Sequence, residues 1–425
     1  MKIAIDARSA TLHQGTGIGT YTNNLISEIL SIDSKDEFTL FCSGKFNNDF
    51  NKKNTNIVYS SGRHGGFYEN CYIPSALNEF HADLYHIPQN GIGFDFDTEI
   101  PTIVTIHDLI PYTMPETVGT GYLEKFLRDM PNIISNSCGI LTVSEYSKKD
   151  ILKFFSSYPE DKIFVTPLAA NNNFKPIDKN NCKLYVEHTF GVTDPYILYI
   201  GGFSLRKNVL GLIKAFSKIY KDLNKPYKLL LGGGLKDEGE KLFTFVKENS
   251  LQDKVIFCGY LEDEVLPILY SGCDAFVYPS LYEGFGLPPL EAMSCKAPVI
   301  TSNLSSIPEV TGDNAILINP HNINELESAL VTLLNDEIFK ANLSEKGYLR
   351  SLEFTWTKTA QNTLDAYRQL TVDSWQWTIN DEITFREILC IQNGGVKNDF
   401  NHFETPPLYI LQKSHWDISP STVNC

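Results

Sequence analysis

The stretch YPSLYEGFGLPPLE, residues 278 to 291, joins an expected strand, Asp274–Tyr278, to an expected helix, Pro289–Ser294. The strand is short and apolar, the loop is rich in glycine, and paired prolines mark the start of the helix. The same strand-loop-helix unit recurs along the chain on both sides of this stretch. Such a βα rhythm with short apolar strands predicts a parallel sheet that is covered by helices on both faces.

Outward from this unit, two series of strands alternate with helical patterns. The series that contains the unit comprises Tyr196–Gly201, Lys228–Gly232, Val255–Gly259, Asp274–Tyr278, Pro298–Thr301 and Ile316–Ile318. The earlier series comprises Lys2–Ala7, Glu37–Cys42, Asn56–Tyr59, Asp83–His86, Thr102–His107, Ile140–Val143 and Lys162–Thr166. The helical patterns are Tyr21–Ser31, Tyr122–Ser135, Ser147–Phe155, Val209–Tyr220, Glu238–Asn249, Asp263–Ser271, Pro289–Ser294 and Ile323–Leu334. The pattern predicts two tandem doubly wound α/β domains, with a ligand in the cleft beyond the carboxyl ends of their strands.

The domain boundaries follow from breaks in this alternation. We expect an N-terminal domain over residues 1–170 and a C-terminal domain over 190–354, joined by a polar segment that contains a helical piece. Residues 371–425 lack the alternation and carry three of the four tryptophans. We interpret them as an appendage of unknown role.

Composition limits the classes of protein that fit. The chain is 42% hydrophobic and 20% charged, as folded soluble proteins are, and no apolar run approaches the roughly 20 residues of a membrane span. A net charge of −15 disfavours binding to nucleic acid. The nine cysteines form no C-x-x-C pair, and the N-terminus runs into a core strand without a signal peptide. We therefore expect a cytoplasmic protein without disulfides or a structural zinc site.

Two carboxylates lie eight residues apart in the opening stretch. Glu283 belongs to the glycine-rich loop, and Glu291 belongs to the first turns of the helix. The backbone N–H groups of Gly286 and Leu287 are expected to point out of the helix N-terminus, where they would bind a phosphate. One carboxylate would then accept hydrogen bonds from a sugar and the other from a ribose. For Glu291 alone, an ordinary first-turn acid that complements the helix dipole is the alternative.

A second motif, GGFSLRKN at residues 201–208, follows a buried strand and opens a helix. Arg206 and Lys207 beside the paired glycines suit a diphosphate, because arginine donates forked hydrogen bonds and lysine supplies a point charge. Taken alone, the two cations also fit a solvated helix start.

Two features that follow N-terminal strands complete the expected cleft. Gly15, Gly17 and Gly19 form a loop whose spacing differs from a dinucleotide fingerprint, and we expect it to lie under a phosphate or an acceptor. His107 ends an expected strand and faces the cleft, where it would bond a sugar. A purely structural histidine is the alternative.

Together these motifs resemble the retaining glycosyltransferases of family four, which have the GT-B fold. The resemblance runs from about residue 1 to 370 and is strongest over 196–319. Its most specific element is the E-x7-E signature, and TVSEYS (142–147), PLAA (167–170), S-x-x-P-E-V (305–310) and FTWTKTA (354–360) are also similar. The resemblance implies two Rossmann-like domains that face each other across a cleft. It further implies that the N-terminal domain binds the acceptor and that a final helix over 355–370 returns to that domain.

The resemblance also implies a role for each matching residue. The expected catalytic residues are Glu283 and His107 on the transferred sugar, with Arg206 and Lys207 on the leaving nucleoside diphosphate, whose charge must be neutralised. Glu291 would bind the ribose. The other expected donor contacts are Gly17, Gly202, Phe285, Gly286 and Leu287, with Gly259, Tyr260 and Leu261 beside the base.

The family transfers a sugar with retention of anomeric configuration by a front-side displacement, so the resemblance implies that neither a metal nor a cofactor is needed. We accordingly interpret Asp95-Phe96-Asp97 as a loop feature and not as a metal site. The stretches IHDLIP (106–111) and IDAR (5–8) look most like bacterial mannosyltransferases that build surface polysaccharides. They favour GDP-mannose as the donor and a glycan or lipid-linked acceptor.

Other functions stay open at this point. A UDP-sugar-dependent transferase of glucose or N-acetylglucosamine would carry the same motifs. A sugar-nucleotide epimerase or hydrolase, or an inactive binding homologue, is a further alternative, although the intact cations and carboxylates argue against lost activity. A glycosidase is disfavoured because one carboxylate is expected at the ribose, and an NAD-dependent oxidoreductase is disfavoured because its fingerprint is missing.

Peripheral membrane contact is a further open point, because the acceptors of such enzymes are often lipid-linked. Lys148, Lys149 and Lys153 share an expected helix with Phe154 and Phe155, which would suit an interfacial patch at the inner face of a membrane. A solvated charged face is the preferred interpretation.

Overall fold

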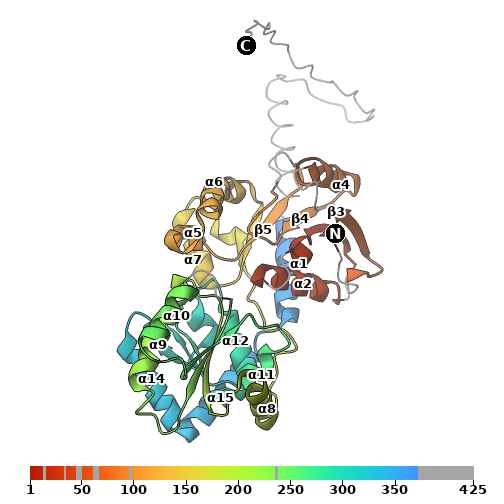
Figure 1. Cartoon of the computed structure of the whole chain (residues 1–425). Helices are drawn as coiled ribbons and strands as arrows, with labels where there is room; N and C mark the ends of the chain where they lie inside the picture. Colours follow the sequence, from red (N-terminus) through yellow and green to blue (C-terminus); the bar gives the residue numbers. More distant parts are fainter. Residues whose placement is uncertain are drawn as a thin grey trace, which may run out of the picture. The chain divides into compact units, whose positions relative to one another are not determined.

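The computed structural model describes residues 1–12, 16–32, 35–44, 50–60, 67–94, 98–234 and 238–371. They form two parallel sheets, one in each half of the chain (Figure 1). The contacts of the chain place both sheets in one compact unit, Met1–Trp375. Three sequence features lie outside the described residues: Gly15, Asp95–Asp97, and the expected appendage apart from its first residue, Thr371.

The N-terminal sheet has seven strands, and every pairing in it is parallel. Their order across the sheet is β3 (Thr55–Ser60), β2 (Glu37–Ser43), β1 (Lys2–Asp6), β4 (Leu84–Ile87), β5 (Thr102–Ile106), β6 (Gly139–Thr142) and β7 (Ile163–Val165). The strand order reverses between β1 and β4. This reversal is the switch point at which doubly wound sheets open a crevice for ligands.

Alternating side chains divide the N-terminal core into two layers, because successive residues of a strand point to opposite faces of the sheet. Ile3 and Ile5 of β1 pack with α2, whereas Ala4 packs with α4, α6 and α7. The helices of this half are α1 (Ser9–Leu12), α2 (Gly17–Ile29), α4 (Ile73–Glu79), α5 (Ile110–Thr113), α6 (Thr120–Asn136) and α7 (Glu145–Phe154), with the short turns η2 (Tyr68–Tyr72), η3 (Pro115–Thr117) and η4 (Glu160–Lys162).

The C-terminal sheet is also wholly parallel, with six strands. Their order is β10 (Val255–Gly259), β9 (Lys228–Gly232), β8 (Tyr196–Ile200), β11 (Ala275–Tyr278), β12 (Val299–Ser302) and β13 (Ile316–Ile318). The order reverses between β8 and β11. The expected fold, two tandem doubly wound α/β sheets, is confirmed.

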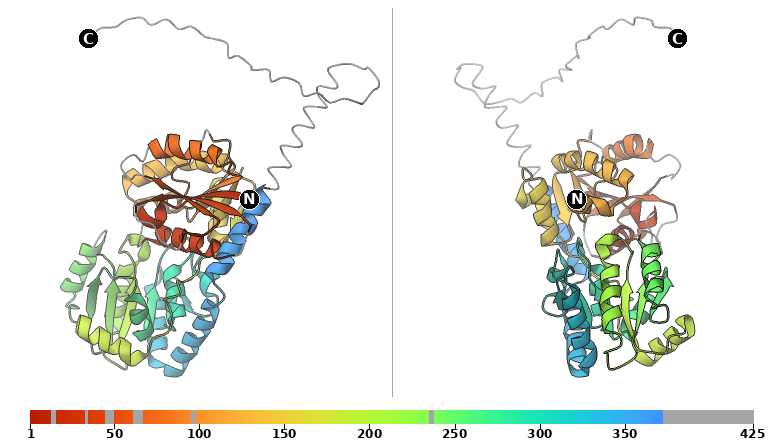
Figure 2. Two further views of the ribbon diagram at one scale, coloured as in Figure 1. Left: turned by 90° about the vertical axis from the view of Figure 1, so that its right-hand side faces the viewer. Right: turned by 60° about the vertical axis from the view of Figure 1, so that its left-hand side comes forward.

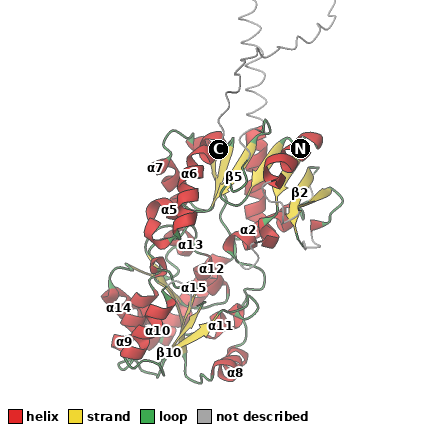
Figure 3. Cartoon of the chain, turned by 45° about the horizontal axis from the view of Figure 1, so that its top comes forward, coloured by secondary structure: helices red, strands yellow, loops and turns green. Residues whose placement is uncertain are grey.

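Helices cover both faces of this second sheet (Figure 3). One group comprises α9 (Val209–Ile219), α10 (Gly239–Glu248) and α14 (Ile323–Asn335). The other comprises α8 (Lys179–Phe190), α11 (Leu266–Gly272), α12 (Leu287–Ser294) and α15 (Glu337–Ser351), while η5 (Leu205–Lys207) and α13 (Ile307–Thr311) are short connecting turns. The helical piece expected in the linker is α8, and its buried residues Cys182 and Val186 pack within the C-terminal domain. The core of that domain therefore begins before residue 190.

The last described helix, over residues 356–371, packs against the N-terminal sheet (Figure 2). Trp356, Leu364 and Tyr367 belong to the same core layer as β1 and α2. The Thr359 hydroxyl donates to the Pro167 carbonyl at 2.6 Å, and the Tyr367 hydroxyl lies 2.6 Å from Nδ1 of His86. The chain thus crosses twice between the two sheets.

The structure describes seven of the nine cysteines and the aromatic and basic residues of α7. The seven cysteines among the described residues are all free. Phe154 and Phe155 pack against the ring of Tyr112, with centroids 5.2 and 5.5 Å apart, so these two rings are used within the domain. Lys148 lies 3.6 Å from Glu160. None of the helices in the described ranges is long and apolar enough to cross a bilayer.

Candidate active site

The carboxyl ends of the two sheets border one cavity of about 490 Å³. On the N-terminal side it is lined by Gly17 at the start of α2 and by His107 after β5. On the C-terminal side it is lined by residues after β8 and around α12, namely Gly202, Lys207, Glu283, Phe285, Gly286, Leu287 and Glu291. The structure therefore brings the separate motifs of the sequence into a single site.

The two C-terminal motifs meet because their strands are neighbours. GGFSLRKN follows β8, the E-x7-E loop follows β11, and these two strands pair at the switch point of the sheet. Gly284 in that loop closely approaches the N-terminal domain, where a Cβ added to it would lie 2.4 Å from the carbonyl oxygen of His107. The Gly284 carbonyl also accepts a 2.7 Å hydrogen bond from the Ser144 hydroxyl. A side chain at residue 284 would push the two halves of the cavity apart.

Glu283 is the centre of a buried ion cluster. Its Oε1 lies 2.6 Å from the Lys207 ammonium and 2.8 Å from the Arg206 guanidinium, and it also accepts hydrogen bonds from the hydroxyls of Tyr278 and Ser280. Burial alone would raise the pKa of Glu283, but Lys207 and Arg206 outweigh it and lower the pKa to about 2. Glu283 is therefore a carboxylate at neutral pH, and it accepts hydrogen bonds without donating any.

The cluster holds both cations in place before any ligand binds. Arg206 also donates to the Tyr282 carbonyl at 2.6 Å, so its guanidinium lies behind Glu283 and does not line the cavity. Lys207 does line it, and Asp108 on the opposite wall is close enough to interact with both cations. A diphosphate entering this site would meet preoriented charges, which is the condition for electrostatic stabilisation of a leaving group.

The N-terminus of α12 adds two backbone donors. Gly286 is its N-cap residue, with φ of 119°, and Leu287 is its first helical residue. Pro288 and Pro289 follow and carry no N–H, so the unpaired donors of this helix start are concentrated at Gly286 and Leu287. Both residues line the cavity, so an anion bound there would meet the two N–H groups.

His107 presents one ring nitrogen as an acceptor. Its Nε2 lies 2.9 Å from the carbonyl oxygen of Pro88, which can only accept, so Nε2 carries the proton and Nδ1 does not. Burial lowers the pKa of His107 to about 4, which keeps the imidazole neutral at pH 7. The ring packs edge-on against Tyr21, with centroids 4.7 Å apart. His107 can therefore accept a hydrogen bond from a sugar hydroxyl.

Glu291, on α12, lines the same cavity. Its Oε2 accepts a 3.1 Å hydrogen bond from the Tyr270 hydroxyl. Burial, aided by the nearby Asp263, raises the pKa of Glu291 to about 7, although the bond from Tyr270 opposes this. The two carboxylates of the E-x7-E signature thus have opposite electrostatic environments, one strongly ionised and one near its midpoint at neutral pH.

Comparison with known proteins identifies the class of enzyme to which this cavity belongs. A family model described as glycosyl transferases group 1 matches residues 184–350, which contain the ion cluster, α12 and Glu291. O-antigen chain mannosyltransferase B of Escherichia coli is 29% identical over 374 residues, which cover 84% of this chain and 96% of that one. The chain contains a group 1 glycosyltransferase domain.

Other relatives support the same family. The serotype-specific mannosyltransferase WbdA of Escherichia coli is 30% identical over 296 residues, 69% of this chain and 36% of that longer one. Among solved structures, sucrose-phosphate synthase from Thermosynechococcus elongatus matches 88% of this chain and all of that one, with a TM-score of 0.68 and 22% identity. HepE of Anabaena, solved with UDP and glucose, matches 87% of this chain and 100% of that one, with a TM-score of 0.68 and 18% identity. The expected GT-B fold of the glycosyltransferase is confirmed.

The residues expected beside the base, Gly259, Tyr260 and Leu261, lie at and just after the end of β10. Gly259 ends β10 with φ of 73°, and the Tyr260 side chain that follows is 72% exposed. Gly259, Tyr260 and Leu261 do not line the cavity. Gly17 lines it as the first residue of α2, whose N-cap Thr16 accepts a 3.2 Å hydrogen bond from the Gly19 N–H, so this part of the expected loop is a helix start. The contact of residues 259–261 with a base stays a prediction.

Several supporting residues of the site were not assigned a role from sequence. Tyr278 and Ser280 hold Glu283, and the Ser306 hydroxyl donates to the carbonyls of Glu283 at 2.9 Å and Phe285 at 2.8 Å. Tyr270 holds Glu291. Tyr278, Ser280 and Ser306 lie inside or beside motifs that are visible in the sequence. Their roles could not be predicted, because a hydroxyl-bearing residue in a loop belongs to no periodic pattern of the sequence.

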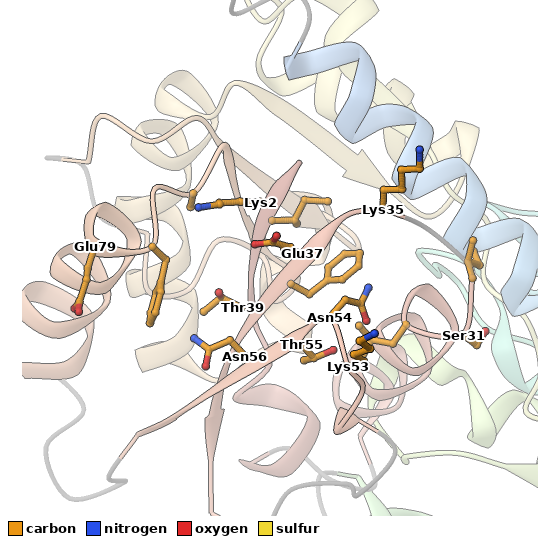
Figure 4. Close-up of a pocket in the computed structure, with 16 residues that line it drawn as sticks. Lys2, Ser31, Lys35, Glu37, Thr39, Lys53, Asn54, Thr55, Asn56 and Glu79 are labelled. Atoms are coloured by element: carbon orange, nitrogen blue, oxygen red, sulfur yellow. The ribbon is translucent and has the colours of Figure 1, made fainter.

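A larger hollow of about 990 Å³ lies at the opposite edge of the N-terminal sheet (Figure 4). It is bordered by the amino-terminal ends of β1, β2 and β3, and its charged lining residues are Lys2, Lys35, Glu37, Lys53 and Glu79. None of the motif residues of the glycosyltransferase lines it. Since parallel sheets of this type bind ligands at carboxyl ends, its size alone does not make it the active site.

Proposed function

We propose that this glycosyltransferase moves a hexose, with retention of anomeric configuration, from a nucleotide-sugar to a glycan or lipid-linked acceptor in the synthesis of a surface polysaccharide. The arrangement that carries this proposal is the Glu283 carboxylate, anchored through Oε1 by Lys207 and Arg206 in a cavity that also receives His107. Within the described residues, the hydrogen bonds and ion pairs of the Glu283 side chain are all on Oε1, so Oε2 is the oxygen left for a sugar hydroxyl.

The proposed division of labour follows from charge and position. Lys207, backed by Arg206 and the N–H groups at the start of α12, stabilises the diphosphate as negative charge develops on it. Glu283 and Nδ1 of His107 accept hydrogen bonds from hydroxyls of the transferred hexose, and Glu291 accepts from the ribose. Positive charge that develops at the anomeric carbon is close to an ionised carboxylate, which favours the transition state over the ground state.

We propose mannose from GDP-mannose as the donor. This choice of donor is supported by the two Escherichia coli relatives compared above, which are both mannosyltransferases. A UDP-sugar donor is the second candidate, favoured by the fold-level similarity to a protein solved with UDP and glucose.

A hydrolase that uses Glu283 as a general acid is disfavoured by the charge of the site. A general acid must hold a proton near the working pH, whereas the pKa of Glu283 is about 2. We propose that the reaction uses no metal and no cofactor, with Lys207 and Arg206 taking the electrostatic role that a metal ion has in other phosphate-binding enzymes. We place the enzyme in the cytoplasm, at the side of the membrane where nucleotide-sugars are made.

Two measurements test the proposal. The first compares the rise in melting temperature caused by GDP and by UDP, because a ligand that binds only the folded state stabilises it in proportion to ln(1 + [L]/Kd). The second measures sugar release and sugar transfer with GDP-mannose, UDP-glucose and UDP-N-acetylglucosamine in the presence of EDTA. Stabilisation by GDP and EDTA-resistant transfer from GDP-mannose are expected. No turnover of any of the three donors would refute the proposal, and turnover of a UDP-sugar alone would replace the donor.

A further inference from the structure

The N-terminal sheet has a pocket of its own at its switch point. The pocket encloses about 250 Å³ between one face of α6 and the loop after β4, with Glu69 of η2 at its edge. Strands β1 and β4, where the order of the sheet reverses, end next to it. This is the position at which a doubly wound sheet binds a ligand, and the donor cavity occupies the equivalent position of the other sheet. A volume somewhat below the roughly 300 Å³ of the smallest drug-sized sites suits a single ring.

A buried ion network fixes one carboxylate at the pocket. The guanidinium of Arg8 makes two hydrogen bonds to the wholly buried Asp6, at 2.6 and 2.8 Å, and a third at 2.8 Å to Oε1 of Glu69. Gln89 donates to Asp6 at 2.9 Å and completes the network. The Glu69 side chain remains 34% exposed, and its Oε2 has no hydrogen-bond partner among the described residues. Buried charge is costly unless it is paired, so this network holds Glu69 in one orientation.

The loop after β4 turns through left-handed conformations and packs closely against α6. Asn90, Gly91 and Gly93 have φ values of 53°, 70° and 90°, in the region that disfavours ordinary residues. A Cβ added to Gly91 would lie 2.3 Å from Cγ2 of Ile133 on α6. Glycine adopts these angles freely, so the loop can lie against α6 and border the pocket, whereas a side chain at residue 91 would collide with Ile133.

The pocket is connected to the donor cavity through two side chains. The Oδ1 atom of Asn90 accepts a 2.9 Å hydrogen bond from the backbone N–H of His107, and the Tyr122 hydroxyl is near enough to Asn90 and Asp108 for both to influence its pKa. Asp108, which lines the donor cavity, is close enough to raise the pKa of Tyr122 together with burial. A ligand in the pocket would therefore lie beside the sugar-binding end of the donor cavity.

The lining of the pocket suits a sugar more than an anion. Its ionisable side chains include two carboxylates, Glu69 and Asp129, against one ammonium, Lys125, which disfavours a phosphate. Its apolar part includes Phe126 and the half-exposed ring of Tyr122. Hexose rings combine hydroxyls, which bind to carboxylates and amides, with C–H faces that pack on aromatic rings.

We propose that this pocket binds a hexose ring of the acceptor glycan, with Glu69 and Asn90 bonding its hydroxyls and Tyr122 packing on its face. The inference rests on the proposed function, since it takes the enzyme to have a glycan acceptor. It assigns the acceptor specificity of the enzyme to the network of Asp6, Arg8 and Glu69 and to one face of α6.

The test uses two pocket variants and two controls from α6 that lie off the pocket. Tyr122→Ala removes the ring, and Glu69→Gln removes the charge while keeping the shape. Leu127→Ala and Glu124→Gln change exposed residues of the same helix that do not line the pocket. The octyl glycosides of mannose and of α-mannobiose serve as probes. For each protein, we would measure the acceptor KM in transfer, the donor hydrolysis without acceptor, the stabilisation by GDP and UDP, and the Kd of each glycoside by titration.

We expect Tyr122→Ala and Glu69→Gln to raise the acceptor KM and the glycoside Kd by about tenfold. Donor hydrolysis and nucleotide stabilisation should stay within about twofold of the wild type, and the control variants should match the wild type throughout. Equal glycoside affinity in the wild type and in Tyr122→Ala, or no glycoside binding by the wild type, would overturn the inference. If the wild type binds a glycoside through Tyr122 but turns over no donor, the pocket stands and the proposed function fails.

Discussion

The carboxylate of Glu309 accepts a 2.7 Å hydrogen bond from the backbone N–H of Tyr146. Its other oxygen accepts a 2.8 Å hydrogen bond from the backbone N–H of Glu145. A side chain of the C-terminal domain therefore binds two backbone N–H groups in the first turn of α7, a helix of the N-terminal domain, which have no partner within that helix. Glu309 belongs to α13, next to Ser306, which supports the Glu283 loop. One short segment thus joins the donor site to the opposite domain.

Replacing Glu309 should loosen this connection. Glu309→Ala leaves two helix N–H groups without partners, and we expect a loss of about 1 to 2 kcal/mol in stability, the usual cost of a lost N-terminal cap. The donor KM should rise as well, because the two walls of the cavity would no longer be held together. Thermal unfolding and donor kinetics would be measured beside Glu345→Ala, whose carboxylate is in a surface ion pair with Lys296. Equal melting temperatures for the two variants would refute the capping role.

Neutralising Glu283 should separate sugar binding from diphosphate binding. Glu283→Gln keeps the shape of the side chain but releases Lys207 and Arg206 from their shared carboxylate. We expect transfer to fall about 10² to 10³-fold, the cost of losing one electrostatic group at a reacting centre. Stabilisation by the nucleoside diphosphate should persist or increase, since both cations lose a competing anion. Weaker stabilisation by GDP together with normal transfer would contradict both assignments.

The two cations should differ in their effects, because only Lys207 lines the cavity. Lys207→Ala removes a charge that faces the ligand and should weaken stabilisation by the nucleoside diphosphate by at least tenfold in affinity. Arg206→Ala should abolish transfer, because Glu283 loses a partner that orients it, and should weaken nucleotide affinity less than Lys207→Ala does. Melting curves with a nucleotide titration and single-turnover rates would be compared with Lys218→Ala, a surface control. Full transfer by Arg206→Ala would refute its role.

The raised pKa of Glu291 predicts a specific pH dependence of stability. The pKa is about 7 in the folded protein against 4.5 as the reference, so folding favours the protonated form. The stabilisation is complete below pH 4.5 and is lost as the pH rises through 7. Relative to Glu291→Gln, the wild type should therefore lose about 3 kcal/mol in the free energy of unfolding between pH 4.5 and pH 8, at 1.36 kcal/mol per pKa unit.

Urea unfolding of the wild type and of Glu291→Gln across this range gives the difference directly. Glu345→Gln is the control for the chemistry of the substitution. If the wild type and Glu291→Gln give parallel curves, the carboxylate does not titrate in this range. Stabilisation by GDP, measured in the same series, should be weaker in Glu291→Ala at every pH, because the ribose loses a hydrogen-bond acceptor.

Most strands could be predicted from the sequence because a short apolar run between turn signals is a local pattern. The expected strands Lys228–Gly232, Val255–Gly259 and Ile316–Ile318 have the same bounds in the structure. Helices with a weak apolar stripe were harder. The polar helix α15 was not predicted. Helix α8 was expected only as a helical piece of a linker, because the packing of α8 on the C-terminal domain depends on residues far along the chain.

The same division applies to the site. Glu283, Lys207 and His107 could be selected from sequence because they follow strands, and the carboxyl ends of strands in a parallel sheet share one edge. The contacts among them could not be selected, since Lys207 and Glu283 are 76 residues apart and meet only because β8 pairs with β11. No sequence motif indicated the pocket that Glu69 and Tyr122 line.

The amino-acid sequence by itself determined the alternation of strands and helices, the two parallel sheets and the residues that lie at their carboxyl ends. These properties depend on local periodicity and on the short range of turn chemistry. The tertiary structure alone decided that Arg206 lies behind Glu283, that Glu291 and Glu283 have opposite pKa shifts, and that Glu309 caps a helix of the other domain. Burial and ion pairing depend on which distant segments come together, and no local pattern records that.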